Sequence, residues 1–522
     1  MRSFRALITF LLSFQVIGCT TVGPDYVPPE LQTPKTFSSE LTGGLRATPD
    51  DKAILSQWWT TLNDPELNTL IERAVEGNLD LRQAAARIRE ARAQRGISEA
   101  DRFPTIDATG SVARKRFRFG TSQDNVLSAT TSYYQAGFDA AWEIDLFGRL
   151  QRQVESSVAE FQATEEEYRD ILVTLLAEVA LNYVEVRSFQ TRIAVAKANR
   201  DAQAKTFDLV LANFEGGEVS RLDVEQARSN LEATRSQIPT LETSLAQAKH
   251  RLAVLLGQEP AALNEELRKP GHVPLAPPQV AIGVPADLLR RRPDVRKAER
   301  ELAAQTAQIG VATAELYPKL TLVGSIGLES FSAGDLVAPI NRVYNLGPTI
   351  QWRVFDAGRI RQNIEVQNAR QEQALIAYEA SVLTGLQDVE DALVAYGKEL
   401  IRRQSLVEAE QATRRMVEVA DDQYRAGEND FLTVLDAQRS LLTIQDQLAA
   451  SNAQVTTNII SVYKALGGGW ATLAPEDVRE SSPDEGHHNQ SEGEKVANRK
   501  TAHNETGQGR DHVNRNLSGG GI

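Results

Sequence analysis

The segment Leu288–Leu328 changes its periodicity once, and this change constrains the fold more than any other feature of the sequence. Pro293 suits the first turn of a helix, because the N–H that proline lacks would be unpaired there anyway. A run rich in Ala, Glu, Gln and Arg follows, and these residues are good helix formers. Pro318 then ends the helix, since the residue before a proline is pushed out of the α region. From Lys319 apolar and polar residues alternate, which predicts a strand directly after the helix.

The same order of helix, proline and strand occurs earlier in the chain, in Leu79–Val112, with the break at Pro104. Other landmarks recur with it, and Gly148 before one long helical stretch reappears as Gly358 before another. Repeats of this length indicate a duplicated half-structure rather than a solenoid. We therefore expect a first repeat at residues 64–272, a proline-rich linker at 273–284 and a second repeat at 285–470.

Each repeat should contain a very long helix. Arg149–Asn213 has neither glycine nor proline and would span about 98 Å if it were helical throughout. Its apolar residues recur mostly at spacings of three and four, which is typical of a coiled-coil seam, and the second repeat has an equivalent stretch. We expect each long helix to end near a glycine, Gly217 or Gly427, and to return as a second helix. A structural coiled coil and the wall of a water-filled tube share this pattern.

Four strands are expected per chain, two from each repeat. In the second strand of each pair, one face is apolar and the other polar over about ten residues, which fits a membrane strand between lipid and water. A half-exposed strand of a soluble protein shows the same alternation. Four strands cannot close a pore, and lipid does not tolerate an open sheet edge, so a membrane-spanning form requires an oligomer. In that form the lipid-facing residues would be Phe138, Trp142, Ile144, Leu346, Ile350 and Trp352.

The two ends of the chain predict export from the cytoplasm and a polar tail. Residues 1–18 have two arginines and then a short apolar segment, as secretory signal peptides do. Cys19, the only cysteine, lies where this signal ends, so we expect it to carry diacylglycerol and an acyl chain. The alternative is an ordinary cleavage site with an incidental cysteine. Residues 19–63 should form a lipidated N-terminal arm, in which Thr21–Leu45 is extended with little packing of its own, and residues 471–522 a disordered tail.

The stretch LLRRRPDVRKAERELAAQTAQIGVATAELYP resembles the signature of the outer-membrane factors of tripartite RND-type efflux systems. These are TolC-like channels, and the chain is most similar to their NodT-like lipoprotein branch. The resemblance implies a mainly α fold with a membrane β-barrel. Three copies would form a homotrimer, in which twelve strands close as one barrel above a coiled-coil barrel of helical hairpins.

The same resemblance implies a location and partners. The protein would be lipid-anchored in the outer membrane, extend into the periplasm and meet a periplasmic adaptor protein and an inner-membrane pump. It also implies that Asp223, Tyr424 and Asp436 belong to a periplasmic gate that closes like an iris. Thr433 stands where some relatives have a further acidic residue.

Composition and missing motifs exclude several classes of function. The net charge of −13 argues against a nucleic-acid partner. The sequence has no phosphate-binding loop, no dinucleotide fingerprint and no hydrolase or zinc-protease motif, so we expect no enzyme, no metal site and no cofactor beyond the lipid on Cys19. Past residue 18, no apolar run approaches the roughly 20 residues of a membrane helix.

Two hypotheses follow from the sequence. The first is an exit channel that passively conducts small molecules, such as drugs or other toxic compounds, from pump and adaptor to the outside. The second is a structural coiled-coil lipoprotein of the envelope without transport. Strands with lipid-suited faces favour the first hypothesis, because a spacer gains nothing from them. The sequence does not indicate which compound is exported.

Overall fold

The computed structural model describes residues 21–473, except 31–33, 35, 48–51, 120–126, 276–279, 284 and 286–290. The predicted signal peptide, Cys19 and the polar tail from residue 474 onward lie outside the described residues. None of the helices in the described part of the chain combines the length and the apolar character needed to cross a membrane.

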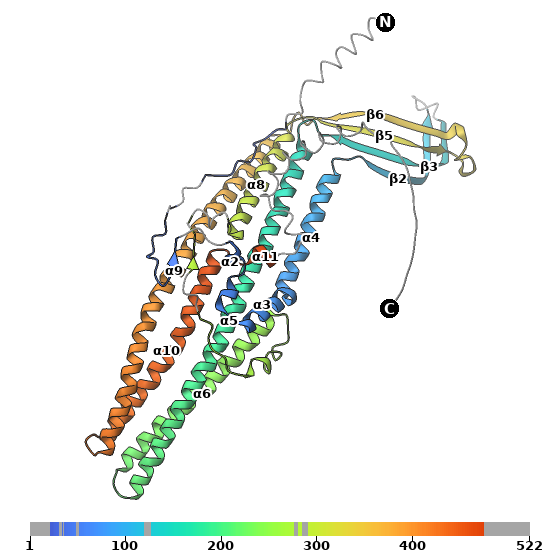
Figure 1. Ribbon diagram of the computed structural model, residues 1–522. Helices are drawn as coiled ribbons and strands as arrows, with labels where there is room; N and C mark the ends of the chain where they lie inside the picture. The colour runs from blue at the N-terminus through green and yellow to red at the C-terminus, as the bar shows by residue number, and fades with distance from the viewer. Residues whose placement is uncertain are drawn as a thin grey trace, which may run out of the picture. The chain divides into compact units, whose positions relative to one another are not determined.

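Two long helical hairpins dominate the structure, one from each repeat (Figure 1). Helices α5 (Arg149–Glu215) and α6 (Arg221–Leu255) form the first hairpin, and α9 (Arg359–Arg425) and α10 (Phe431–Ala465) form the second. The first helix of each hairpin has 67 residues, which corresponds to about 100 Å. The remaining helices are α2 (Lys52–Ser56), α3 (Pro65–Gly77), α4 (Leu79–Ala100), α8 (Pro293–Ala314), α11 (Trp470–Leu473) and the short 3-10 turns η2 (Trp58–Leu62), η3 (Glu266–Arg268), η4 (Ala333–Asp335) and η5 (Pro339–Asn341).

The predicted junctions of helix and strand are confirmed. Pro293 occupies the first turn of α8, which ends at Ala314, and strand β5 (Lys319–Ser330) begins just after Pro318. In the first repeat, α4 is followed after Pro104 by strand β2 (Thr105–Phe119).

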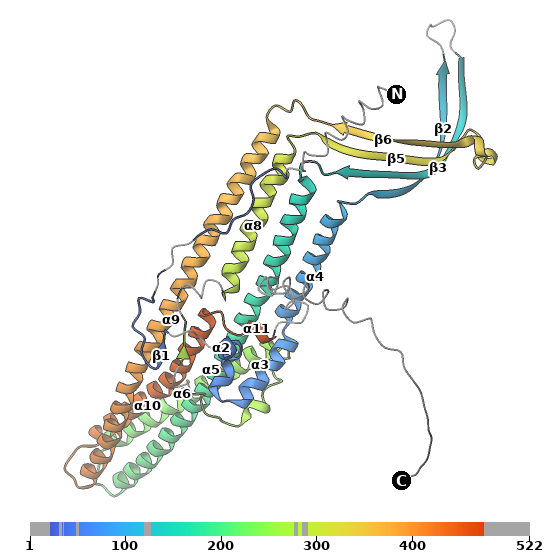
Figure 2. The same cartoon turned by 45° about the horizontal axis from the view of Figure 1, so that its top comes forward.

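A four-stranded antiparallel sheet has the order β2-β3-β5-β6, with β3 at Leu127–Ile144 and β6 at Arg342–Gln351. The alternation in the sequence predicts this strand only from Gln135, because Leu127–Tyr134 is mostly polar and does not alternate; in the structure β3 begins eight residues earlier, at Leu127. The outer parts of β2 and β3 bend away from β5 and β6 (Figure 2). Two further two-residue strands, β1 (Leu45–Arg46) and β4 (Val280–Ala281), pair in parallel.

Close contact between β3 and β5 depends on two glycines. Gly137 and Gly327 lie opposite each other in the register, and a Cβ on Gly137 would come within 2.7 Å of the carbonyl oxygen of Ile326. No side chain fits at that distance, so glycine allows the two backbones to approach each other here.

In both repeats, the helix that precedes the strands begins beside the end of the hairpin's second helix: α4 begins at the end of α6, and α8 at the end of α10. Asn78, the N-cap of α4, donates from Nδ2 to the carbonyl of Leu255, the last residue of α6, at 2.9 Å. Arg292, the N-cap of α8, donates from a guanidinium nitrogen to the carbonyl of Ala465, the last residue of α10, at 3.0 Å. These two helix joints satisfy carbonyl groups that a helix end leaves without an intrahelical partner.

The arm after Cys19 is extended, as predicted, but it is held firmly by the helices. Arg152 of α5 is buried and donates to the carbonyl of Val22 at 3.1 Å and to the carboxylate of Asp25 at 2.6 Å. Tyr26 donates to Glu299 of α8 at 3.1 Å, and Glu390 of α9 accepts from backbone N–H groups further along the arm. We call the described residues 21–30 and 36–47 the strap. Sequence alone did not predict these contacts, because they join residues more than a hundred positions apart.

Candidate functional site: the two-faced sheet and the hairpin tips

The register separates the sheet into an apolar face and a polar face across all four strands. Residues paired directly in an antiparallel sheet point to the same side. The apolar face carries Ile106, Ala108, Phe138, Trp142, Ile144, Leu320, Leu322, Ile326, Leu346 and Ile350. The polar face carries Asp107, Thr109, Asp139, Glu143, Thr321, Ser325, Asn345 and Thr349. Leu346 is 74% exposed and Ile350 is 70% exposed, so a single chain leaves the apolar face largely uncovered.

Five of the six residues predicted to face lipid lie in strands on this apolar face. The sixth residue, Trp352, was predicted to lie in strand β6. This prediction was wrong, because β6 ends at Gln351, the residue before it. Its indole N–H instead donates to the carbonyl of Leu316, just after α8, at 3.0 Å. Trp142 makes the equivalent bond to the carbonyl of Arg102, just after α4, at 2.9 Å. Each tryptophan thus ties the inner end of a strand to the end of a helix.

The hairpin tips at the other end of the long helices are tight turns. Gly217 and Gly427 have φ angles of +78° and +75°, the left-handed conformation that a helix C-terminus uses and that glycine adopts without strain. Asp223 forms a capping box with Ser220, whose backbone N–H and hydroxyl both donate to the Asp223 carboxylate, at 2.9 and 2.8 Å. This predicted gate residue therefore also stabilises the first turn of α6.

An apolar cluster joins the two hairpins at their tips, and we call it the tip cluster. Its buried members are Val210, Val224, Ala227, Ala420, Phe431, Val434, Leu435 and Ala437. Phe207, Leu211, Val219, Val417 and Tyr424 pack against it. Because α5, α6, α9 and α10 all contribute side chains, one hairpin cannot move relative to the other at this level without breaking these contacts.

Two of the three predicted gate residues, Tyr424 and Asp223, lie close enough for the charge of Asp223 to act on Tyr424. The ring of Tyr424 packs on Phe431 with centroids 5.4 Å apart, and its hydroxyl oxygen is buried. Burial raises the pKa of Tyr424, and the negative charges of Asp223 and Glu218 raise it further. Asp436 is exposed on α10 and, in the described part of the chain, its ion-pair partner is Arg439 at 3.7 Å.

Polar pairs continue the contact between the hairpins away from the tip. Arg192 of α5 and Asp446 of α10 form two hydrogen bonds, at 2.7 and 2.9 Å. Asn199 donates to Gln445 at 2.8 Å, and Arg439 donates to Asn230 of α6 at 3.0 Å. The sequence did not reveal these pairs, because polar residues on the outer face of a coiled coil look the same whether they meet water or another hairpin.

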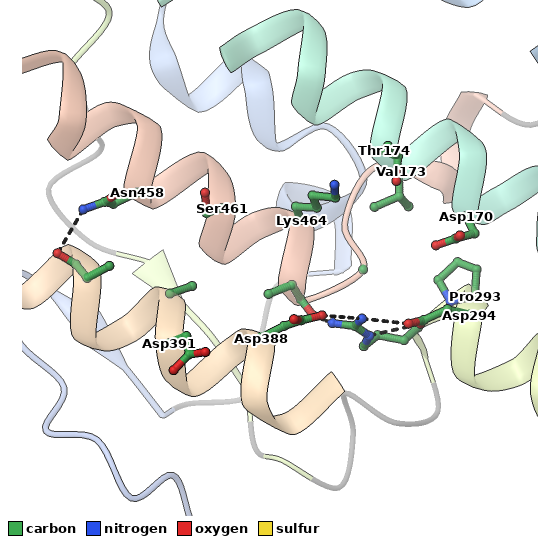
Figure 3. Close-up of a pocket in the computed structure, with 15 residues that line it drawn as sticks. Asp170, Val173, Thr174, Pro293, Asp294, Asp388, Asp391, Asn458, Ser461 and Lys464 are labelled. Atoms are coloured by element: carbon green, nitrogen blue, oxygen red, sulfur yellow. Dashed lines mark hydrogen bonds and ion pairs between the residues drawn. The ribbon is translucent and has the colours of Figure 1, made fainter. Parts of the chain in front are cut away.

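A cavity of about 430 Å³ lies beside the second helix joint, between α5, α8, α9 and α10 (Figure 3). Its charged lining residues are Asp170, Asp294, Asp388, Asp391, Arg292 and Lys464. Arg292 pairs with Asp294 at 2.7 Å and with Asp388 at 2.8 Å, so this cluster holds the joint together. Burial, followed by the charge of Asp294, raises the pKa of Asp170. Among the described residues, no group of three or more His, Cys, Asp or Glu side chains could hold a metal ion.

Comparison with known proteins accounts for this architecture. The profile of the outer membrane efflux protein family matches residues 70–258 and 284–468. Nodulation protein T of Rhizobium leguminosarum bv. viciae is 32% identical over 489 residues, which cover 92% of this chain and 97% of that protein. The cation efflux system protein CusC of Escherichia coli is 31% identical over 478 residues, which cover 89% of this chain and 98% of that protein.

A solved structure has the same fold. The outer-membrane channel OprN superposes with a TM-score of 0.80 at 37% sequence identity, over 86% of this chain and 99% of that chain. The two matched segments of the family profile correspond to the two repeats, each with its strand pair and its hairpin. The chain therefore belongs to the outer membrane efflux protein family, whose members are efflux channels of the outer membrane.

Proposed function

We propose that the chain is the exit duct of a tripartite efflux pump and that it passively conducts small molecules from the pump and a periplasmic adaptor to the outside. The observation that carries this proposal is the two-faced sheet. Its uncovered apolar face suits lipid, and its polar face, with Asp107, Asp139 and Glu143, suits a water-filled lumen. An apolar face of this extent marks a surface that lipid or another protein covers, and its place between two unpaired sheet edges favours lipid.

The duct is complete only in an oligomer. Strands β2 and β6 are the two edges of the sheet in each chain, and an unpaired edge is not stable in lipid. When β6 of one copy pairs with β2 of the next, the antiparallel order continues. Three copies supply twelve strands, so we assign a homotrimer with a single closed barrel.

An exposed apolar stripe on α9 supports the same assembly. Within the chain α9 packs on α8 and α10. Away from these helices, α9 presents a row of side chains that are 48–68% exposed: Ile376, Leu383, Val394, Ile401 and Val419. At about 100° per residue, their spacing keeps them within about 20° of one another on the helix. Such a narrow row is typical of a coiled-coil seam, and we assign a helix of the neighbouring copy to it.

The hairpin tips serve as the gate in this proposal. Three copies bring three pairs of tips together around the axis, about 100 Å from the sheet. Asp223 and Asp436 then form acidic rings that favour cations, and the tip cluster holds the closed arrangement. The adaptor and the inner-membrane pump act here by drawing the tips apart.

Lipid on Cys19 anchors the protein in addition to the barrel. One of the relatives, SilC of Salmonella typhimurium, is named a probable outer membrane lipoprotein. The strap begins two residues after Cys19 and is clamped to α5, α8 and α9. It therefore fixes the acyl chains close to the helices from which the strands emerge.

The mass of the detergent-extracted mature protein tests the proposal first, with bound detergent subtracted. We expect a trimer that resists mild denaturation and conducts ions in a planar bilayer. A monomer without conductance would refute the duct and leave the structural coiled-coil lipoprotein in its place.

The gate is tested in the same bilayer. Asp223→Ala combined with Asp436→Ala should leave the trimer intact, raise basal conductance and weaken cation selectivity. Ser220→Ala is the matched control, because it breaks the same capping box without removing a charge. Equal conductance and selectivity in the double variant and in the control would show that the carboxylates do not gate.

A further inference from the structure

Arginines occupy the outer end of the apolar face. Following β2 outward from α4, successive positions on this face are Ile106, Ala108, Gly110, Val112, Arg114 and Arg116. On β6, which runs in the opposite direction, the outermost residue of the same face is Arg342, and Tyr344 and Leu346 follow it inward. The face therefore changes from apolar to basic at the end of the sheet that is remote from the helices.

Among the described residues of the sheet, no carboxylate lies beside Arg114 or Arg342 on the apolar face. None of the described strand residues on the apolar face is acidic, since Asp107, Asp139 and Glu329 all lie on the polar face. Arg114 and Arg342 are exposed, and neither forms an ion pair within the described part of the chain. A positive charge held beside an apolar surface is stabilised by an anion at the same depth.

The depth of these arginines agrees with a membrane interface. Eight residues separate Ile106 from Arg114, which is about 26 Å along a strand. With the tilt of strands in membrane barrels this is about 20 Å of depth, close to the roughly 25 Å of an apolar band. Tyr134 and Tyr344 lie on the same face near this boundary, where aromatic side chains gather in membrane proteins.

We infer that Arg114 and Arg342 form an arginine collar that binds the phosphate groups of lipopolysaccharide in the outer leaflet. This inference rests on the proposed function, because β6 of one copy and β2 of the next become neighbours only in the closed barrel. Each binding site then lies at a seam, with Arg342 from one subunit and Arg114 from the other. A guanidinium group binds two phosphate oxygens at once, and a phosphorylated glycolipid offers such groups at this depth.

A lipid fits this surface better than a protein does. The collar lies on the same side of the sheet as Phe138 and Ile326, so a protein bound to it would have to replace lipid. The zwitterionic head group of phosphatidylethanolamine, by contrast, carries its own cation and competes poorly for an arginine.

The test measures binding of purified lipid A to the detergent-extracted trimer by native mass spectrometry. Arg114→Gln combined with Arg342→Gln should weaken binding about 25-fold, since each basic residue near an anionic lipid contributes about fivefold. Arg114→Lys with Arg342→Lys should retain most of the affinity, and lipid A without phosphate should bind wild type and variant equally weakly. Lys115→Gln is the matched control, because Lys115 is one residue away on the polar face, where it lies over the Tyr133 ring at 4.3 Å.

Equal binding of lipid A to wild type and to the double glutamine variant would overturn the collar, and so would an equal loss with Lys115→Gln. Conductance of the same preparations separates this result from a failure of the duct. A trimer that conducts normally but binds lipid A independently of the arginines refutes the collar alone. A wild-type chain that neither trimerises nor conducts refutes the proposed function, and the collar with it.

Discussion

Phe431 gives the sharpest test of the tip cluster as the element that holds the hairpins together. Its side chain is 3% exposed and packs between residues of both hairpins. Replacing a buried phenylalanine by alanine costs about 3–5 kcal/mol, and part of this is the contact with the Tyr424 ring.

The effect on gating depends on how much of this contact is lost when the hairpins separate. If opening exposes half of the Phe431 side chain, Phe431→Ala shifts the equilibrium by about 1.5–2.5 kcal/mol toward the open state. This corresponds to about a tenfold to seventyfold increase in the open fraction while that fraction is small. We expect the increase to be visible as basal conductance of the purified trimer in a planar bilayer.

Leu432→Ala is the matched control. Leu432 is the next residue on the same helix, but it is 45% exposed and is not part of the tip cluster, so its replacement should change the equilibrium by about 0.5 kcal/mol at most. Circular dichroism and the heat resistance of the trimer establish that both variants assemble. If the two variants assemble and conduct equally, the tip cluster does not hold the gate closed.

Three further outcomes are expected from the described contacts. Arg152→Leu removes the buried donor that holds Val22 and Asp25, so the strap should become sensitive to protease at a cost of about 2–4 kcal/mol; unchanged protection would contradict this. Arg292→Met leaves the Ala465 carbonyl and two carboxylates without their cation, which should cost about 3–5 kcal/mol of folding stability. We expect this loss as a lower dissociation temperature of the trimer. Asp170→Asn should stabilise the protein at pH 7: burial raises the pKa of Asp170 in the folded state, so wild-type stability falls as the pH rises from 3.8 through that raised pKa. The free energy of unfolding, measured with urea at several pH values, checks this. If it changes with pH equally in wild type and Asp170→Asn, the reasoning is refuted.

Local chemistry predicted much of the fold from the sequence. Pro104 and Pro318 correctly predicted where helix gives way to strand, and Gly217 and Gly427 correctly predicted the turns. The sequence predicts return helices at Ser220–Leu256 and Asp430–Leu466, and the structure has them at Arg221–Leu255 and Phe431–Ala465. These features depend on backbone conformations that proline and glycine impose or permit, so a single sequence reveals them.

Contacts between distant segments could not be predicted in this way. The helix joint at Arg292, the clamp of Arg152 on the strap and the Arg192–Asp446 pair all use arginines that look in the sequence like ordinary residues of a solvated helix face. Trp352 was misassigned for a related reason, because the alternation of β6 continues beyond its last backbone hydrogen bond. Periodicity predicts which face a residue occupies, but it does not predict what covers that face.

The two hairpins are held very differently within one chain, although they come from equivalent repeats. Helix α5 is enclosed by α3, α4, α6, α8 and α10, whereas the main helix contacts of α9 are with α8 and α10. In the proposed trimer, the exposed apolar stripe of α9 is available to a neighbouring copy, and the position of the second hairpin would then depend on the oligomer as much as on its own chain. Near the tip its contacts to the first hairpin are the tip cluster and a few polar pairs. A small force applied at the tips meets less resistance there than at α5, so we expect the α9–α10 hairpin to be the one that moves when the gate opens.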